Sequence, residues 1–77
     1  MSPAMEDLLF GVIKSAFSKR RKSLKNSMVG GELGLEKPIV IDALNTASIV
    51  PERRAETLSV EEFKALAMAV WKIRQET

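Results

Sequence analysis

The sequence predicts an all-α fold: a small bundle of about four helices and no sheet. Several segments repeat apolar residues at intervals of three and four, which places those residues on one face of a helix. The run from Ile39 to Ile41 is β-branched, as in a buried strand, but the sequence offers no second strand to pair with it. A chain of 77 residues is too short for a second folding unit, so we expect one domain over residues 1–77.

The first helix is predicted between Met5 and Phe17, where the apolar residues form one continuous stripe. Gly11 falls on the polar side of this stripe, where it costs about 1 kcal/mol relative to alanine. After Phe17 the apolar positions become sparse but keep helical spacing. We therefore expect a second short helix, or a kinked continuation of the first, from Arg20 to Met28.

A flexible loop is expected over about residues 29–36. Gly30, Gly31 and Gly34 give this segment too much backbone freedom to hold a helix. Pro38 then fits the first position of a third helix, because proline has no amide hydrogen and a fixed φ. The apolar stripe of that helix is weaker and consists of Ile41, Leu44 and either Ala47 or Ser48.

The fourth helix is expected to begin at Ser59. Ser59 and Glu62 form an S-x-x-E capping box, in which each side chain accepts a hydrogen bond from the backbone N–H of the other residue. Leu58 and Phe63 stand at the apolar positions that flank such a box. The predicted core-facing stripe is Phe63, Leu66, Ala67, Val70 and either Ile73 or Arg74.

The composition excludes most of the chemistry that small domains perform. The chain has no cysteine and no histidine, which rules out zinc fingers, thiol nucleophiles and histidine-based acid–base catalysis. We therefore expect no catalytic, metal or cofactor site. The apolar run from Leu8 to Ile13 is too short for a signal peptide or a membrane span, so we expect a cytoplasmic protein with no membrane partner.

The net charge is only +2, but the positive charge is concentrated in one region. Every charged residue from Leu8 through Gly31 is basic, and the segments on either side carry −2 each. Arginine offers phosphate oxygens a rigid fork of donors, lysine adds a point charge, and each neutralised phosphate releases counterions. Short basic runs are also common as solvated surface, so charge alone leaves nucleic-acid binding and a solvated run equally open.

Two ordered motifs resemble a known family. Residues 16–28 have the sequence A-F-S-K-R-R-K-S-L-K-N-S-M, which resembles the A-F-x-x-R-R-K-x-L-x-N-x-L signature of ribosomal RNA adenine dimethyltransferases of the kasugamycin-resistance type. Residues 51–67 have the sequence P-E-R-R-A-E-T-L-S-V-E-E-F-K-A-L-A, similar to the P-x-x-R-A-E-x-L-S-x-x-x-F-x-x-L-A stretch that follows in this family.

The resemblance implies that the chain is the carboxy-terminal helical, RNA-binding domain of a two-domain enzyme. Such enzymes dimethylate two adjacent adenines of small-subunit rRNA with S-adenosylmethionine as methyl donor. Their catalytic domain is Rossmann-like and amino-terminal, and its glycine-rich donor loop and N-[LIV]-P-[YF] motif are absent from this sequence. The start of the chain at Met1, just before the matching region, suggests an excerpt. The implied partners are small-subunit rRNA and the methyltransferase domain, with the chain monomeric.

Carried over position by position, Arg20, Arg21 and Lys22 match the R-R-K of the family and are the first candidates for contacts with the rRNA backbone. Further candidates beside them are Lys14, Lys19, Lys25 and Asn26. Asn26 matches the asparagine of the motif, but an asparagine near a helix end often caps backbone groups instead. Both roles stay open for it.

Other matching or aromatic residues are interpreted as structural. Arg54 and Glu56 match the R-A-E element, and we expect an ion pair or turn-holding hydrogen bonds that fix the last helix. Trp71 is expected in the core or at the seam with a neighbouring domain. Packing roles are also expected for Phe10, Phe17 and Phe63, with Phe10 the one that could face the catalytic domain.

The chain departs from the family pattern in a long, glycine-rich segment before Pro38 and in Ser48, which stands where an alanine-glycine pair is common. Another class of function also fits the composition: a freestanding helical module that binds protein, with the basic run merely solvated. A helix-turn-helix DNA binder fits less well, because the glycine loop is long for that turn and no recognition helix exposes base-reading residues.

Overall fold

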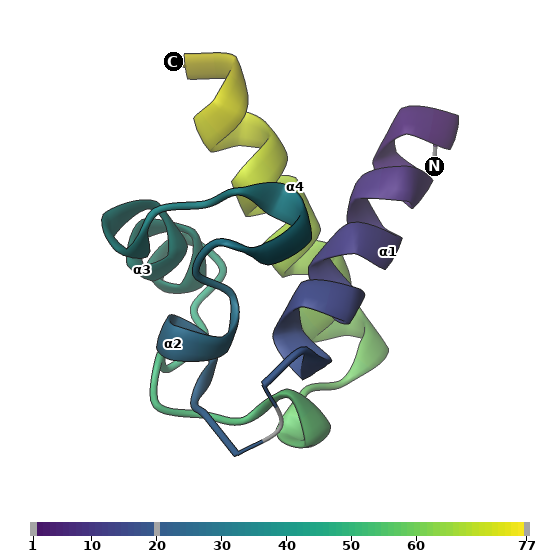
Figure 1. The fold of residues 1–77 in the computed structure, drawn as a ribbon. Helices are drawn as coiled ribbons and strands as arrows, with labels where there is room; N and C mark the ends of the chain where they lie inside the picture. Colours follow the sequence, from purple (N-terminus) through teal and green to yellow (C-terminus); the bar gives the residue numbers. More distant parts are fainter. Residues whose placement is uncertain (1, 20, 77) are drawn as a thin grey trace.

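The computed structural model describes residues 2–19 and 21–76. Figure 1 shows that the carboxy-terminal helix runs through the middle of the molecule, with the first helix on one side and the second and third on the other. The described residues contain no strand, only an isolated bridge between Gly30 and Leu35. The prediction of an all-α bundle without a sheet is confirmed. The elements are α1 (Pro3–Phe17), α2 (Leu24–Ser27), a 3-10 turn η1 (Gly31–Leu33), α3 (Lys37–Thr46), a 3-10 turn η2 (Ala55–Thr57) and α4 (Val60–Glu76).

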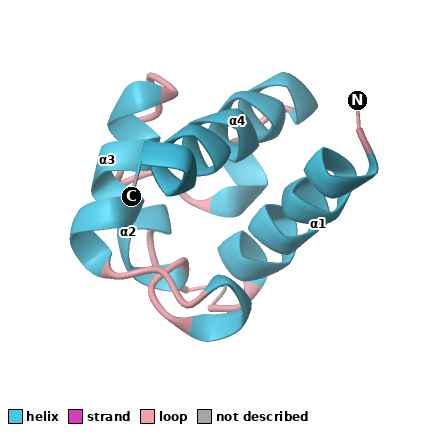
Figure 2. Cartoon of the chain, turned by 90° about the horizontal axis from the view of Figure 1, so that it is seen from above, coloured by secondary structure: helices cyan, strands magenta, loops and turns pink. Residues whose placement is uncertain are grey.

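The core lies where α1 and α3 pack against α4 (Figure 2). The apolar stripe predicted for α4 is confirmed, and its last position is Ile73 rather than the exposed Arg74. Ala69 joins this stripe. The buried apolar residues that the other helices contribute are Leu8, Val12 and Ala16 from α1, Leu24 from α2, and Val40, Ala43 and Leu44 from α3.

The first helix begins two residues earlier than its apolar stripe, at Pro3, because the Ser2 hydroxyl caps it by accepting a hydrogen bond from Met5 N at 3.2 Å. The interpretation of Gly11 as a residue on the free polar side was wrong. A Cβ at this position would meet Leu33 Cδ2 at 3.1 Å. Glycine therefore lets η1 pack closely against α1.

The glycine-rich segment forms a closed turn against the bundle. Gly30 N donates to Leu35 O at 2.7 Å, and Leu35 is buried in the core. From the far end of the chain, Arg74 donates to Leu33 O at 2.9 Å. Three glycines of the turn have positive φ, which explains why glycine occurs there so often. The flexibility expected over residues 29–36 stays a prediction.

The second helix is much shorter than expected, because residues 18–19 and 21–22 lie in turns and α2 contains only four residues. The reason is a contact between α2 and a segment that is distant in the sequence. Leu24 N donates to Arg53 O at 2.8 Å and Lys25 N to Pro51 O at 3.1 Å, so the segment after α3 binds the first amide groups of α2. The basic run is therefore presented by a turn between two helices.

The third helix exists as predicted, but its buried face was predicted only in part, with Leu44 correct. Val40, Ala43 and Leu44 are buried, whereas Ile41 and Ala47 are half-buried. Pro38 occupies the second helical position, after Lys37. Ala47 and Ser48, the alternatives for the last position of the predicted stripe, both lie beyond the last helical residue, Thr46.

The capping box at the start of α4 is confirmed. Glu62 N donates to the Ser59 hydroxyl at 3.1 Å, and Ser59 N donates to Glu62 Oε1 at 3.0 Å. The ion pair that fixes this start joins Arg53 to Glu62. For Arg54 and Glu56 the sequence predicted an ion pair or turn-holding hydrogen bonds. Both side chains are exposed, and the Arg54 carbonyl holds the turn by accepting hydrogen bonds from Thr57 N at 3.0 Å and from the Thr57 hydroxyl at 2.7 Å.

Candidate nucleic-acid interface

The basic run lies in the connection between α1 and α2, at one end of the molecule (Figure 1). We call its described residues, 18–19 and 21–23, the basic turn. Lys22 N donates to Lys19 O at 2.9 Å. The Ser18 hydroxyl lies 2.7 Å from Ser15 O and 3.1 Å from Ser27 O. It can donate its hydrogen bond to either carbonyl, one near the end of α1 and the other at the end of α2. These contacts give the turn a defined position on the bundle.

Lys19 is held toward α2 rather than projecting freely. Its Nζ lies 3.5 Å from Asn26 O and 3.4 Å from Val29 O, two carbonyl groups at the end of α2. Both are long hydrogen bonds that leave the ammonium exposed to solvent. The ammonium is thereby positioned without being neutralised.

Three of the predicted residues share one surface hollow. Lys19, Lys22 and Asn26 line a shallow hollow of about 410 Å³. The remaining lining residues are Val29 and Lys37. We call these five residues the basic hollow. Its lining contains three lysines and no carboxylate, which makes it suited to an anion.

The other predicted residues are not part of this hollow. Lys25 forms an ion pair with Glu52 at 3.0 Å, and its ammonium lowers the pKa of the Glu52 carboxyl. Arg21 is exposed in the basic turn, and Lys14 is exposed on the last turn of α1. Arg20 lies outside the described residues. The described members of the predicted set thus fall into three groups. Three residues line the shared hollow, Arg21 and Lys14 are exposed outside it, and Lys25 is paired with Glu52.

Asn26 has contacts that favour its capping role. Its Nδ2 donates to the hydroxyl of Ser23, the residue that precedes α2, at 3.5 Å. Its backbone N donates to Ser23 O at 3.0 Å. The half-buried side chain also borders the basic hollow. Asn26 therefore makes a local structural contact and still faces the hollow.

Lys37 is the member of the hollow that sequence reasoning missed. It follows Lys25 by twelve positions, beyond the glycine segment, and stands next to the carboxylate residue Glu36, so no local charge run marks it. The turn closed by the Gly30–Leu35 bridge returns the chain to α2 and so brings Lys37 beside the basic turn. Only the closed geometry of that turn could have identified it.

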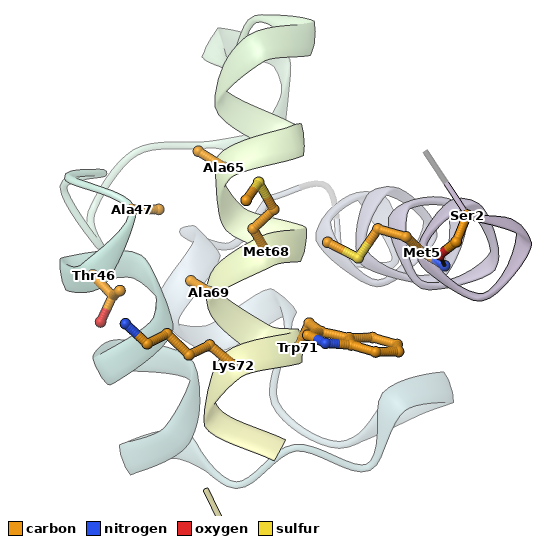
Figure 3. A pocket seen from close by; sticks show the side chains of 9 residues that line it. All are labelled: Ser2, Met5, Thr46, Ala47, Ala65, Met68, Ala69, Trp71 and Lys72. Carbon is orange, nitrogen blue, oxygen red and sulfur yellow. Dashed lines mark hydrogen bonds between the residues drawn. The ribbon is translucent and has the colours of Figure 1, made fainter. Parts of the chain in front are cut away.

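A second depression is apolar. Figure 3 shows Met5 of α1 pointing toward α4, from which Met68 and Trp71 project. We call this hollow of about 880 Å³ the apolar groove. Its full lining is Ser2, Met5, Thr46, Ala47, Ala65, Met68, Ala69, Trp71 and Lys72.

The aromatic residues differ in how well they were predicted. Phe63 is buried, and its ring lies 6.1 Å from that of Phe17, which confirms packing roles for both. Trp71 is 39% exposed at the groove, so it is not a core residue. Phe10 is 68% exposed, and a packing role within this chain was therefore wrong.

The described residues hold no group of three or more carboxylate, cysteine or histidine side chains close enough to share a metal ion. Among these residues no helix combines the length and hydropathy required to cross a bilayer. Gly30, Gly31 and Gly34 do not fit S-adenosylmethionine, because a four-residue helix rather than a strand precedes them and they surround the short turn η1 rather than opening a long helix.

The chain is similar in sequence to segments of known proteins. Over 66 residues, 86% of this chain, it is 58% identical to ribosomal RNA small subunit methyltransferase A of Desulforapulum autotrophicum. Proteins of the same name from Desulfitobacterium hafniense and Alkaliphilus metalliredigens are 52% and 46% identical over 82% and 84% of the chain. The matched segment covers only 22–23% of these three relatives. No protein-family model and no solved structure matches the chain.

Proposed function

Because this chain is related to a segment of ribosomal RNA small subunit methyltransferase A, as its two motifs predicted, we propose that it is the rRNA-binding, substrate-orienting domain of such an enzyme. The enzyme is a small-subunit (16S) rRNA adenine dimethyltransferase that uses S-adenosylmethionine. The chain spans less than a quarter of its relatives, so the methyl transfer is assigned to a separate, Rossmann-like domain.

One observation carries the RNA-binding role: a fixed turn and an adjoining hollow concentrate positive side chains that the bundle holds in place. Arg21 and Lys22 are exposed, and within the described residues neither forms an ion pair. Folded RNA is recognised mainly through its shape and its phosphates. A rigid basic surface is suited to that mode, because it gains affinity from each phosphate that it neutralises.

The proposal includes two partners and a location. Small-subunit rRNA contacts the basic turn, with Arg20 included on the strength of its motif position. The methyltransferase domain of the same protein is the second partner, and the chain orients that domain on the target adenines. The chain is monomeric in this scheme and functions in the cytoplasm, where ribosomal subunits are assembled.

Charge reversal tests the assignment. Arg21→Glu with Lys22→Glu should lower the affinity for a transcript of small-subunit rRNA more than about tenfold and reduce the slope of log affinity against log salt by about 1.5–2. The matched control is Lys64→Glu with Lys72→Glu, which makes the same change in net charge at exposed positions of α4. Circular dichroism must show an unchanged fold in both.

Equal losses in the two double variants would show that binding reflects net charge only and would refute the assignment. An affinity that Arg21→Glu with Lys22→Glu leaves unchanged at low salt would refute it as well.

A protein-binding module is the second candidate, and the apolar groove is the observation that favours it. Met68 is 61% exposed, and exposed apolar clusters commonly mark interaction sites. Met68→Lys separates the two candidates. Unchanged rRNA affinity in this variant agrees with our proposal, whereas loss of rRNA association in Met68→Lys but not in the Arg21 and Lys22 variant would favour the groove as the functional surface.

A further inference from the structure

We propose that Lys37, at the first position of α3, completes a binding site for an RNA backbone phosphate in the basic hollow. The inference rests on the proposed function and adds to it a specific residue and a specific ligand group. It extends the RNA-binding surface from the basic turn to the start of α3, a region that neither sequence motif includes.

Charge is the first argument. Lys19 and Lys22 reach the hollow from the basic turn, and Lys37 reaches it from α3. Within the described part of the chain neither Lys22 nor Lys37 takes part in an ion pair, and the hydrogen bonds of Lys19 go to neutral carbonyl groups. Lys25 differs, because Glu52 neutralises it outside the hollow. Like charges gathered in this way repel one another, and an anion placed among them removes that repulsion.

The second argument is that the fold fixes the backbone segments that carry these lysines. Gly30 N donates to Leu35 O at 2.7 Å, and the buried Leu35 anchors the segment that leads into α3. On the other side of the hollow, Lys19 Nζ lies 3.4 Å from Val29 O, so it connects the basic turn to the same segment. A site formed before the ligand arrives loses less conformational freedom on binding.

The start of α3 adds a weaker contribution. Glu36 precedes the helix but makes no hydrogen bond with its side chain to the first amide groups, and its carboxylate is not part of the hollow. The amino end of a ten-residue helix carries partial positive charge. This charge adds to that of Lys37. RNA is favoured over an acidic peptide as the ligand, because the exposed Arg21 continues the basic surface beyond the hollow.

Removal of a single lysine tests the inference. Lys37→Ala should lower the affinity of the chain for a small-subunit rRNA transcript about threefold to tenfold at low salt and reduce the salt slope by about 0.7–1. The control is Lys72→Ala, which removes one exposed lysine near the opposite end of α3, where Thr46 and Lys72 both line the apolar groove. It should leave affinity and slope unchanged, and both variants should keep the melting temperature of the wild-type chain.

A local readout accompanies the affinity. The side-chain amide of Asn26 borders the hollow, whereas that of Gln75 is exposed on the last turn of α4 and lines no part of it. Addition of the rRNA transcript should shift the NMR signals of the Asn26 amide in the wild-type chain. The shift should shrink in Lys37→Ala, and the signals of the Gln75 amide should stay unchanged as an internal reference.

The two proposals fail in different ways. If the charge reversal at Arg21 and Lys22 abolishes binding while Lys37→Ala behaves as Lys72→Ala does, the phosphate site is wrong and the RNA-binding function stands. If the reversal leaves binding unchanged, the function itself is wrong. A wild-type Asn26 amide that does not respond to bound rRNA would also overturn the phosphate site.

Discussion

Ser48 shows how one backbone conformation terminates α3. Its φ is +60°, in the left-handed region that non-glycine residues seldom adopt. Ser48 N donates to Asn45 O at 3.0 Å and Ile49 N to Leu44 O at 2.8 Å. Together they form the two hydrogen bonds of a Schellman motif, which normally has glycine at this position. The departure from the alanine-glycine pair of the family thus falls at the residue where the chain must turn.

We predict that Ser48→Gly stabilises the chain. A Cβ in the left-handed region costs the folded chain about 1–2 kcal/mol, and glycine removes this cost. The greater backbone entropy of glycine in the unfolded chain offsets about 0.5–1 kcal/mol of that stabilisation. The net effect is about 0.5–1 kcal/mol, seen as a higher melting temperature in thermal denaturation. Ser48→Ala keeps the Cβ and should give no gain. An equal gain in both variants would contradict the argument.

Glu62 makes the stability of the chain depend on pH. The Arg53 guanidinium, helped by the backbone N–H of Ser59, lowers the pKa of Glu62 from 4.5 to about 2. The folded chain therefore favours the carboxylate. Its contribution to stability is complete above the ordinary pKa of 4.5 and is lost as the pH falls through about 2.

Unfolding in urea between pH 6 and pH 2 tests this dependence. The wild-type chain should lose stability as the pH falls, and Glu62→Gln should be less stable at pH 6 and show a flatter profile. Glu61→Gln, at the neighbouring exposed position, is the control and should follow the wild-type curve. A Glu62→Gln profile as steep as that of the wild type would contradict the role of the ion pair.

At the scale of elements, the contact between Gly11 and Leu33 couples α1 to η1. Alanine is a better helix former than glycine by about 1 kcal/mol, but its Cβ here would lie 3.1 Å from Leu33 Cδ2. We predict that Gly11→Ala stabilises a Leu33→Ala background by about 1 kcal/mol and the wild-type background by less. Denaturant unfolding of the four proteins forms a double-mutant cycle. Additive effects would show that this close approach is unimportant.

Elements with local causes were predictable from the sequence, and those with distant causes were not. The capping box of Ser59 and Glu62 and the stripe of α4 depend on neighbours three or four residues apart. By contrast, α2 is short because its amide groups bind the carbonyls of Pro51 and Arg53. No local pattern contains that contact.

The candidate site, too, was predictable only where its residues are close together in the sequence. The motif identified Lys22 and Asn26, and the basic run around it added Lys19; the structure brings all three to one hollow. The sequence pattern could not show that Lys25 would be paired with Glu52, or that Lys37 would arrive from another element. Both facts depend on where the turns after α2 and α3 place residues distant in the chain.

At the scale of the whole molecule, α3 separates two surfaces of different chemistry. Lys37 at its amino end lines the basic hollow, and Thr46 at its carboxyl end lines the apolar groove. A helix of ten residues is about 15 Å long, so separate partners can occupy the two sites. This arrangement suits a domain that holds RNA at one surface and a methyltransferase domain at the other, as we propose.

The salt dependence of rRNA binding by the wild-type chain tests the central claim most directly. Four basic residues, Lys19, Arg21, Lys22 and Lys37, belong to the proposed binding surface within the described residues. At about 0.7–0.9 per neutralised phosphate, they should give a slope near −3 in a plot of log affinity against log salt concentration. A slope close to zero would mean that phosphates are not what this chain binds and would contradict the account.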